Sequence, residues 1–482
     1  MMSSQESIAG SAEGAGLAES AGLAESAGLA ESAGSAESAG SAEGAGLAES
    51  AGSAESAGSA ESAGGRIGRF RAVICGLLFA ATVINYIDRQ MIGVLKPTLQ
   101  QEFGWTEVTY GDIVLWFQAA YAVGFVLFGR IMDRLGTRLG YFLAMSLWTV
   151  AHIAHGAART AASFMVARFF LGLGESGSFP AGLKAVADWF PKRERALAIG
   201  IFNAGSNIGA ILTPLLVPAI TLAFGWRMAF LLTGAFSIVW LPIWWILYRL
   251  PEHHPRVGAA ELAHIQSDRE PVAPAVAWGR LLTVRETWAF ALGKFLIDPI
   301  WWMFLFWLPD FLARRHGLNL QTFAPPLIAV YVMSDIGSVA GGWLSSRLMS
   351  RGVSLNRARK LAMLVCAVCV VPIVLASKVD SLWLAVLIIG LATAAHQGFS
   401  ANLFALPSDV FPRQAVGSVV GIGGAAGAIG GMVMAKYAGW VLDRLGTYTP
   451  IFIVAASAYL IALLVIHILA PRLSPARLDE LG

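Results

Sequence analysis

Apolar runs of membrane-spanning length recur along this sequence from residue 70 to residue 470. Each is close to the roughly 20 residues that an α-helix needs to cross about 30 Å of hydrocarbon. Of the 482 residues, 56% are hydrophobic and 13% are charged, an apolar excess that is unusual for a soluble domain. Since a bilayer offers the backbone no hydrogen-bonding partner, and alternating strands are absent from the sequence, the chain must cross as helices. We predict an all-α integral membrane protein with twelve transmembrane helices, at about 70–95, 109–132, 137–158, 160–185, 196–219, 226–249, 286–312, 323–347, 359–378, 381–407, 416–440 and 448–470.

Composition divides the chain into a tail and two helical bundles. Residues 1–65 repeat the unit AGLAES or AGSAES and contain ten Glu but no Lys, Arg or Asp, which predicts a low-complexity, acidic and disordered tail. The segment 249–285 is polar and punctuated by Pro, as expected of a cytoplasmic linker. We therefore predict one six-helix bundle at 66–248, and a second at 286–482 that ends in a short cytoplasmic tail.

The two predicted bundles share an internal repeat. DWFPKRERALAIGIFNAGSNIGA at 188–210 aligns at a constant offset with DVFPRQAVGSVVGIGGAAGAIGG at 409–431, pairing Gly209 with Gly430. Repeats of this kind place a binding site near the bilayer midplane between the two halves, and one half rocks against the other to expose it alternately.

Basic residues gather in alternate loops, which predicts the orientation of the chain. Lys and Arg cluster at 130–138, 192–195 and 347–360. By the positive-inside rule, these loops and both termini face the cytoplasm.

Four ionisable side chains lie inside predicted helices: Asp88, Arg89, Arg168 and Glu175. A charge at this depth costs roughly 2.5–3.5 kcal/mol on insertion scales, so we expect these groups to be paired or to face a watery cavity. Asp88 and Arg89 are about 100° apart around their helix and must have different partners. Arg168 and Glu175, seven residues apart, lie on nearly the same face and could meet.

The four charges sum to zero, and protonation of either carboxylate would leave a positive cavity suited to a monoanion. This is the chemistry of proton-coupled anion symport. In the alternative interpretation, the charges only hold helices together as structural ion pairs. Arg168 could either bind a substrate carboxylate or keep Glu175 ionised, and we favour the second role.

Several motifs resemble a known family. GRIMDRLGTRLG at 129–140 resembles the loop between the second and third helices of the major facilitator superfamily, which implies a gating motif at Gly129, Asp133, Arg134 and Arg138. More specific stretches are similar to the anion:cation symporters of sugar acids: NYIDR (85–89), RFFLGLGESGSFPAGLKAVADWFPKRERA (168–196), FNAGSNIGA (202–210) and DPIWWMFLFWLPDFL (298–312). Within that group, AHQGFSANLFALPSDVFP at 395–412 is similar to the hexuronate transporters.

This resemblance implies roles for three of the charges. In the family, the Asp of the first-helix motif and the Glu of the fourth-helix motif are the proton-linked acids, and the Arg after the Asp binds substrate. These roles fall on Asp88, Glu175 and Arg89. The resemblance also implies a bacterial inner-membrane protein that binds a small anionic sugar acid and protons.

A sugar acid also presents hydroxyl groups, which require neutral donors and acceptors on the wall of the site. The candidates are Tyr86, Tyr121, Asn203, His396, Gln397 and Asn402, with Trp301 or Trp302 as an apolar wall for the ring. For each, the alternative is an interfacial anchor or a hydrogen bond between helices. Lys294 and Asp298, one helical turn apart, predict a local salt bridge near an interface with a structural role.

We expect a secondary transporter that imports a hexuronate, such as galacturonate or glucuronate, by proton symport. The alternatives are symport of another organic anion (aldonate, aldarate or other carboxylate) or, from another class, a transporter-like membrane sensor. An enzyme is not expected, because HExxH, GxSxG and the phosphate-cradling GxxxxGK[ST] are all absent from the sequence. We also expect no cofactor, no metal and no nucleic-acid partner, and a monomer in the bilayer.

Overall fold

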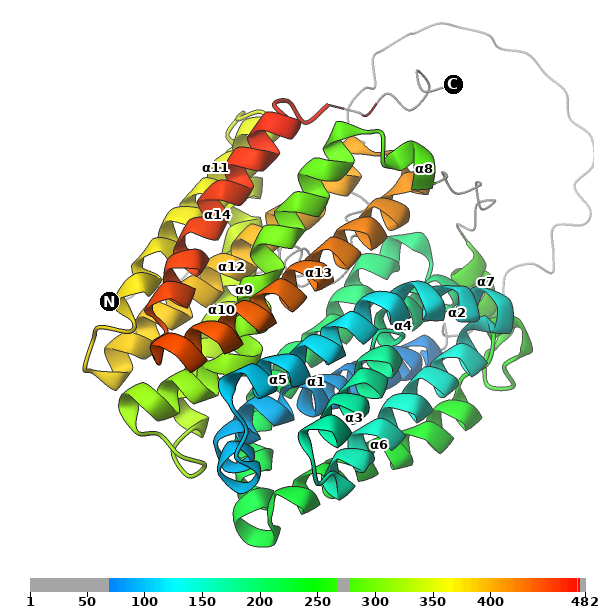
Figure 1. The fold of residues 1–482 in the computed structure, drawn as a ribbon. Coiled ribbons are helices and arrows are strands. Elements are labelled where there is room, and N and C mark those ends of the chain that lie inside the picture. Colours follow the sequence, from blue (N-terminus) through cyan, green and yellow to red (C-terminus); the bar gives the residue numbers. More distant parts are fainter. Residues whose placement is uncertain (1–68, 268–277, 475, 477–482) are drawn as a thin grey trace, which may run out of the picture.

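The structure is a computed structural model that describes residues 69–267, 278–474 and 476, so the predicted acidic tail at 1–65 lies outside the described residues. The described residues form helices, turns and connecting segments, with no strand among them. Figure 1 shows two bundles side by side, which confirms the all-α fold class. The first contains α1 (Phe70–Phe103), α2 (Glu107–Ala157), α3 (Ala161–Glu175), α4 (Ser178–Trp189), α5 (Lys192–Phe224) and α6 (Trp226–Leu247).

The second bundle follows a segment that contains η1 (Pro251–His253), α7 (Ala259–Gln266) and α8 (Trp278–Leu281). It consists of α9 (Arg285–His316), α10 (Ala324–Ser350), α11 (Leu355–Val370), η2 (Val371–Leu375), α12 (Leu382–Val410), α13 (Arg413–Leu445) and α14 (Thr449–Leu469).

Ten helices or helix limbs in the described residues are long and apolar enough to cross a membrane, compared with the twelve predicted. The difference lies in two spans. The predicted span 137–158 is the second limb of α2, joined to the first limb at Gly136, whose φ of 78° suits glycine because it has no Cβ. The predicted span 160–185 is divided into α3 and α4, which are separated at Ser176 and Gly177.

The segment between the bundles docks on the first bundle through α7. The backbone N–H of Arg71 donates to Glu261 on α7 at 3.1 Å, and Glu194 at the start of α5 contacts both Arg71 (3.0 Å) and His264 on α7 (2.7 Å). Burial alone would raise the pKa of Glu194, but the hydrogen bond from His264 and the charge of Arg71 hold that pKa below its usual range.

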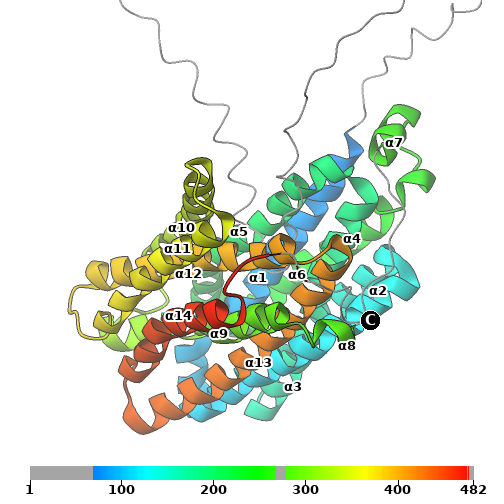
Figure 2. The ribbon, with the colours of Figure 1, turned by 90° about the horizontal axis from the view of Figure 1, so that it is seen from above.

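The two bundles meet along three pairs of helices: α2 with α13, α1 with α9, and α5 with α10 (Figures 1 and 2). Glycines allow the backbones to touch. A Cβ on Gly111 of α2 would lie 2.7 Å from the carbonyl oxygen of Ala435, and one on Gly439 of α13 would lie 2.8 Å from that of Glu107. Small residues at such crossings are typical of helix packing in membranes.

The repeat seen in the sequence has a counterpart in the packing of each bundle. A Cβ on Gly209 of α5 would lie 2.6 Å from the carbonyl oxygen of Val83 on α1. A Cβ on Gly430 of α13 would lie 2.3 Å from the carbonyl oxygen of Phe295 on α9. The aligned glycines therefore make equivalent contacts, and Val83 and Phe295 occupy equivalent positions in the two halves.

An ion-pair network closes one end of the interface between the bundles. Lys96 Nζ of α1 lies 2.7 Å from Glu107 Oε2 and 2.9 Å from Asp310 Oδ2 of α9. Arg314 pairs with both carboxylates, at 2.8 Å from Asp310, and the hydroxyl of Tyr448, which precedes α14, donates to Asp310. We call this end, formed by these five residues, the sealed end. Its carboxylates and its lysine are buried, and removing one partner of a buried ion pair costs about 3–5 kcal/mol.

Candidate functional site

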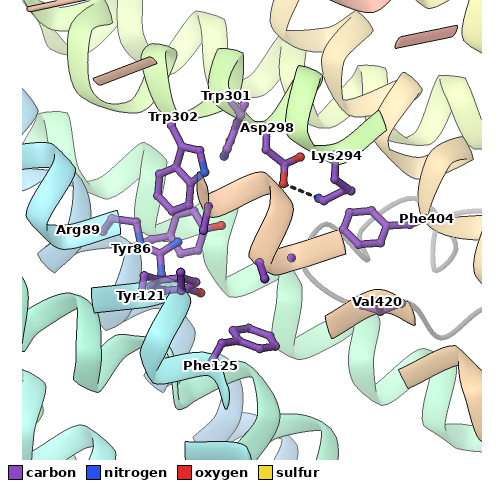
Figure 3. Close-up of a pocket in the computed structure, with 14 residues that line it drawn as sticks. Tyr86, Arg89, Tyr121, Phe125, Lys294, Asp298, Trp301, Trp302, Phe404 and Val420 are labelled. Carbon is purple, nitrogen blue, oxygen red and sulfur yellow. Dashed lines mark ion pairs between the residues drawn. The ribbon is translucent and has the colours of Figure 1, made fainter. Parts of the chain in front are cut away.

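A cavity with two lobes extends from the space between the bundles into the first bundle. Figure 3 shows the residues that line the larger lobe. The larger lobe spans about 740 Å³, counting the solvent at its mouth, and separates α1 and α2 from α9, α12 and α13. The smaller lobe, about 440 Å³, lies within the first bundle between α1, α2, α4 and α5. Both lobes share Tyr86, Arg89 and Tyr121 in their linings, so Arg89 lies where they meet.

Arg89 is held by two polar side chains, Glu175 behind the cavity wall and Asn85 in the lining of the smaller lobe. Its Nε donates to Glu175 Oε2 at 2.9 Å, and its Nη2 donates to Asn85 Oδ1 at 2.8 Å. Glu175 is the last residue of α3 and is fully buried, and its second oxygen, Oε1, has no hydrogen-bond partner in the described part of the chain. Within the described residues, the hydrogen bonding of the Glu175 carboxylate is thus directed to Arg89, whose guanidinium borders the cavity.

Aromatic rings surround the same guanidinium. Its Cζ lies 4.8 Å from the ring centre of Tyr86, 5.1 Å from that of Tyr121 and 5.5 Å from that of Trp302 on α9. Figure 3 shows the indole of Trp302 above Arg89, with Tyr121 on the other side. Ring faces attract cations at such distances. The rings therefore position Arg89 and line the cavity beside it.

Arg168 lies behind this group and not in the lining of either lobe. Its guanidinium is fully buried, donates to the carbonyl oxygen of Arg89 through both terminal nitrogens at 3.4 Å, and sits 4.4 Å from the ring of Phe117. Spacing along the helix allowed a direct Arg168–Glu175 pair, but the structure pairs Glu175 with Arg89. Arg168 instead supports the backbone of α1 at Arg89.

Asp88 points to a different partner, as its position next to Arg89 predicted. It is fully buried, its Oδ1 lies 3.2 Å from His152 Nε2, and it is outside the lining of both lobes. The same imidazole nitrogen lies 2.8 Å from the hydroxyl of Thr233 on α6. Our sequence reasoning missed His152, although a histidine in the middle of an apolar span is itself a signal.

Asn203 is the one predicted hydroxyl-binding residue of α5, and it lines the smaller lobe together with Asn85 and Ser206. The amide nitrogens of Asn203 and Asn85 are buried without a hydrogen-bond partner in the described residues. Because buried polar groups in proteins are almost always satisfied, these two donors mark a place where a polar ligand fits.

The three candidates on α12 lie outside the lining of both lobes: His396, Gln397 and Asn402. His396 Nδ1 lies 2.7 Å from the hydroxyl of Tyr459, and its ring stacks at 5.2 Å on Trp301, which does line the larger lobe. Asn402 donates to the carbonyl oxygen of Gly341 at 3.0 Å, the interhelical hydrogen bond that we had considered as the alternative. His396 thus packs behind Trp301, which borders the larger lobe.

Lys294 and Asp298 form the predicted local salt bridge, with 2.8 Å between Nζ and Oδ2. Both residues also line the larger lobe across from Tyr121, which the sequence reasoning did not predict (Figure 3). The signal that places them there is the one already applied to Asp88, namely a charge within an apolar span.

The predicted gating motif surrounds the bend of α2, at the end away from the sealed end, and comprises Gly129, Asp133, Arg134 and Arg138. The side chain of Asp133 lies outside the described part of the structure, and Arg134 is exposed. Arg138 donates to the carbonyl oxygen of Trp245 and covers its ring at 4.3 Å. These contacts tie the bend to α6.

Comparisons with known proteins agree with this architecture. The family model of the Major Facilitator Superfamily matches residues 78–435. A hexuronate transporter of Escherichia coli K12 is 32% identical over 408 residues, which are 83% of this chain and 94% of the relative. A galacturonate transporter of Dickeya chrysanthemi is 34% identical over 285 residues, 58% of this chain and 82% of the relative.

A solved structure supports the fold. A bacterial homolog of the human lysosomal transporter Spinster, in an inward-facing and unoccupied conformation, superposes with a TM-score of 0.62. The alignment covers 83% of this chain and 96% of that one, at 18% identity. The resemblance to the superfamily that the sequence motifs suggested is thereby confirmed.

Proposed function

Because the chain belongs to the Major Facilitator Superfamily, we propose that it imports a hexuronate, such as galacturonate or glucuronate, by proton symport across a bacterial inner membrane. The protein is a multi-pass membrane transporter and not an enzyme. One observation carries the proposal: Arg89, held by the buried carboxylate of Glu175, borders both lobes of the cavity.

The carboxylates of Glu175 and of the substrate compete for Arg89, and this competition couples proton binding to anion binding. While Glu175 is ionised, it neutralises Arg89 and the site has no net attraction for an anion. When Glu175 takes up a proton, the guanidinium turns its two-pronged donor set to the carboxylate of the substrate. Proton and anion thus bind together. Asp88 remains the second proton-linked acid that the family resemblance implies, with His152 beside it.

Neutral groups bind the remainder of the sugar acid. The tyrosines and Trp302 enclose the ring, and the unsatisfied amide nitrogens of Asn85 and Asn203 donate to hydroxyl groups. A site built on such donors discriminates strongly against ligands that lack the matching hydroxyls, because the buried donors would then stay unpaired.

Transport by alternating access requires the sealed end to open. The basic loops at 130–138 and 347–360 lie at the other end of the bundles, so the positive-inside rule places the sealed end outside the cell. This arrangement corresponds to a state closed to the outside. Uptake then depends on separating Lys96 and Glu107 from Asp310 and Arg314.

Replacement of Lys96 by methionine is expected to shift the population toward a state open at the sealed end. The change leaves the two buried carboxylates of Glu107 and Asp310 to share the single cation of Arg314. Because the loss of one partner of a buried ion pair costs about 3–5 kcal/mol, the open state is favoured by tenfold or more. Spin labels at the exposed Gln101 and Gln321, in a background without the native cysteines, would report a longer distance across this end.

Lys184→Met provides the matched control, because Lys184 donates to the carbonyl oxygen of Met132 away from the sealed end. An unchanged distance distribution in the Lys96 variant would contradict a gating role for the network.

Uptake into proteoliposomes tests the function itself. We expect labelled galacturonate or glucuronate to accumulate under an inward proton gradient and to leak out after an uncoupler is added. If another organic anion accumulates and the hexuronates do not, the proposed substrate is wrong and symport stands. Binding without flux of any anion would support a transporter-like sensor.

A further inference from the structure

The proposed function leaves one charged pair in the cavity without a role. Lys294 and Asp298 of α9 line the larger lobe, 2.8 Å apart and one turn from each other. Lys294 Nζ also lies 3.9 Å from the ring centre of Phe404 on α12. Figure 3 shows this pair across the lobe from Tyr121 and Phe125, on the wall that belongs to the second bundle.

The internal repeat places this pair at positions equivalent to cavity-lining residues of the first bundle. Val83 and Phe295 make equivalent contacts with the aligned glycines of α5 and α13. Three residues further along each helix stand Tyr86 and Asp298, and both line the larger lobe. Asp298 is thus the counterpart of Tyr86, whose ring contacts Arg89.

The neighbouring helix leaves room for the carboxylate. A Cβ on Gly427 of α13 would lie 2.1 Å from Asp298 Oδ2, so only glycine fits opposite this group as it stands. The residues of α13 that line the same lobe are small or aliphatic: Val420, Gly424, Ala425 and Ala428. The pair therefore lines the larger lobe while its carboxylate packs against the backbone of α13 at Gly427.

We propose that Lys294 and Asp298 form a distal subsite that binds the hydroxyl-bearing end of a monoanionic sugar acid and excludes a second carboxylate. This inference rests on the proposed function. The pair has no net charge, yet it offers an ammonium donor and a carboxylate acceptor, which together match a hydroxyl group. A ligand with a carboxylate at each end would bring its second charge against Asp298.

The charge balance of the cavity leads to the same specificity. Protonation of Glu175 releases one positive charge, that of Arg89, while Lys294 stays neutralised by Asp298. The loaded site thus balances a single negative charge. Hexuronates and aldonates carry one carboxylate, and aldarates carry two, so this chain prefers the first two classes.

Replacement of Asp298 by asparagine tests the inference in proteoliposomes. Galactarate and galacturonate compete for uptake of labelled galacturonate, and the ratio of their inhibition constants is measured. In the Asp298→Asn variant, the ammonium of Lys294 has lost its carboxylate partner and attracts the second carboxylate of galactarate. We expect the ratio to move toward galactarate by roughly tenfold to a hundredfold, the range for one charge-assisted contact.

Two further variants act as controls. Asp380→Asn removes a carboxylate from an exposed pair with Arg315 and should leave the ratio unchanged. The double variant Lys294→Met/Asp298→Asn removes both charges, and it should weaken galacturonate uptake without any gain for galactarate.

Gly427→Ala provides a probe that changes no charge. Its Cβ displaces the Asp298 carboxylate, so galacturonate should bind at least tenfold more weakly. The inference would be overturned by an unchanged ratio of the galactarate and galacturonate inhibition constants in Asp298→Asn, or by an unchanged galacturonate affinity in Gly427→Ala. Either result leaves the proposed function standing, provided that the wild-type chain transports hexuronate. Absence of hexuronate transport by the wild-type chain would instead refute the proposed function.

Discussion

Replacing Arg89 by alanine is expected to abolish saturable uptake of galacturonate, with a loss of a hundredfold or more. Each charge-assisted hydrogen bond to a carboxylate contributes about 1.5–3 kcal/mol, and a guanidinium makes two in parallel. The substitution also removes the partner of Glu175, whose carboxylate is fully buried. Binding of galacturonate to the purified variant, measured by calorimetry, should be lost together with uptake.

Two variants separate loss of the site from loss of the fold. Arg89→Lys keeps a positive charge opposite Glu175 but cannot make the two-pronged contact, so it should fold normally and still bind galacturonate at least tenfold more weakly. Arg227→Ala removes an arginine from an exposed pair with Glu102 and should transport like the wild type. Saturable uptake by a folded Arg89→Ala variant would show that the substrate carboxylate is bound elsewhere.

Replacing Glu175 by glutamine is expected to uncouple the transporter without disabling it. Glutamine neither gains nor loses a proton in the working range, so Arg89 stays available to the substrate at every pH. Counterflow, in which unlabelled galacturonate inside the vesicle exchanges with labelled galacturonate outside, should therefore persist. Accumulation driven by a proton gradient should fall to the level of empty vesicles.

A carboxylate outside the site serves as the control for this variant. Glu102 is exposed and pairs with Arg227, so Glu102→Gln should retain both exchange and accumulation. If Glu175→Gln loses counterflow, then Glu175 belongs to substrate binding. If it retains gradient-driven accumulation, the coupling proton is carried by another group, and Asp88 beside His152 becomes the first to test.

The polar residues of α12 show where sequence reasoning reached its limit. His396, Gln397 and Asn402 were plausible cavity residues because they are polar positions in a helix of small residues. The rotation of α12 depends on a contact between backbones, since a Cβ on Gly341 of α10 would lie 2.3 Å from the Cα of Gly398. That contact turns Asn402, one turn further on, toward α10 and away from the cavity.

The ion pair of Glu175 shows the same limit. Spacing along one helix specifies which residues share a face, and on that basis Arg168 and Glu175 could meet. It does not specify what a neighbouring helix presents to that face. The close approach of α3 to α2, where a Cβ on Gly172 would lie 2.2 Å from the carbonyl oxygen of Phe117, inserts the ring of Phe117 against Arg168. Arg89 then reaches Glu175 from α1.

The sequence by itself determined that this chain lies in a membrane as helices, that its halves repeat, and that a set of charges inside those helices must serve a purpose. Hydrophobic length and the cost of a charge in hydrocarbon are local properties, and a single chain displays them without any partner. Only the tertiary structure decided which charges meet one another and which of them border the cavity. Those outcomes depend on how far each helix is rotated and how closely it approaches its neighbours, and both are set by packing between residues far apart in the chain.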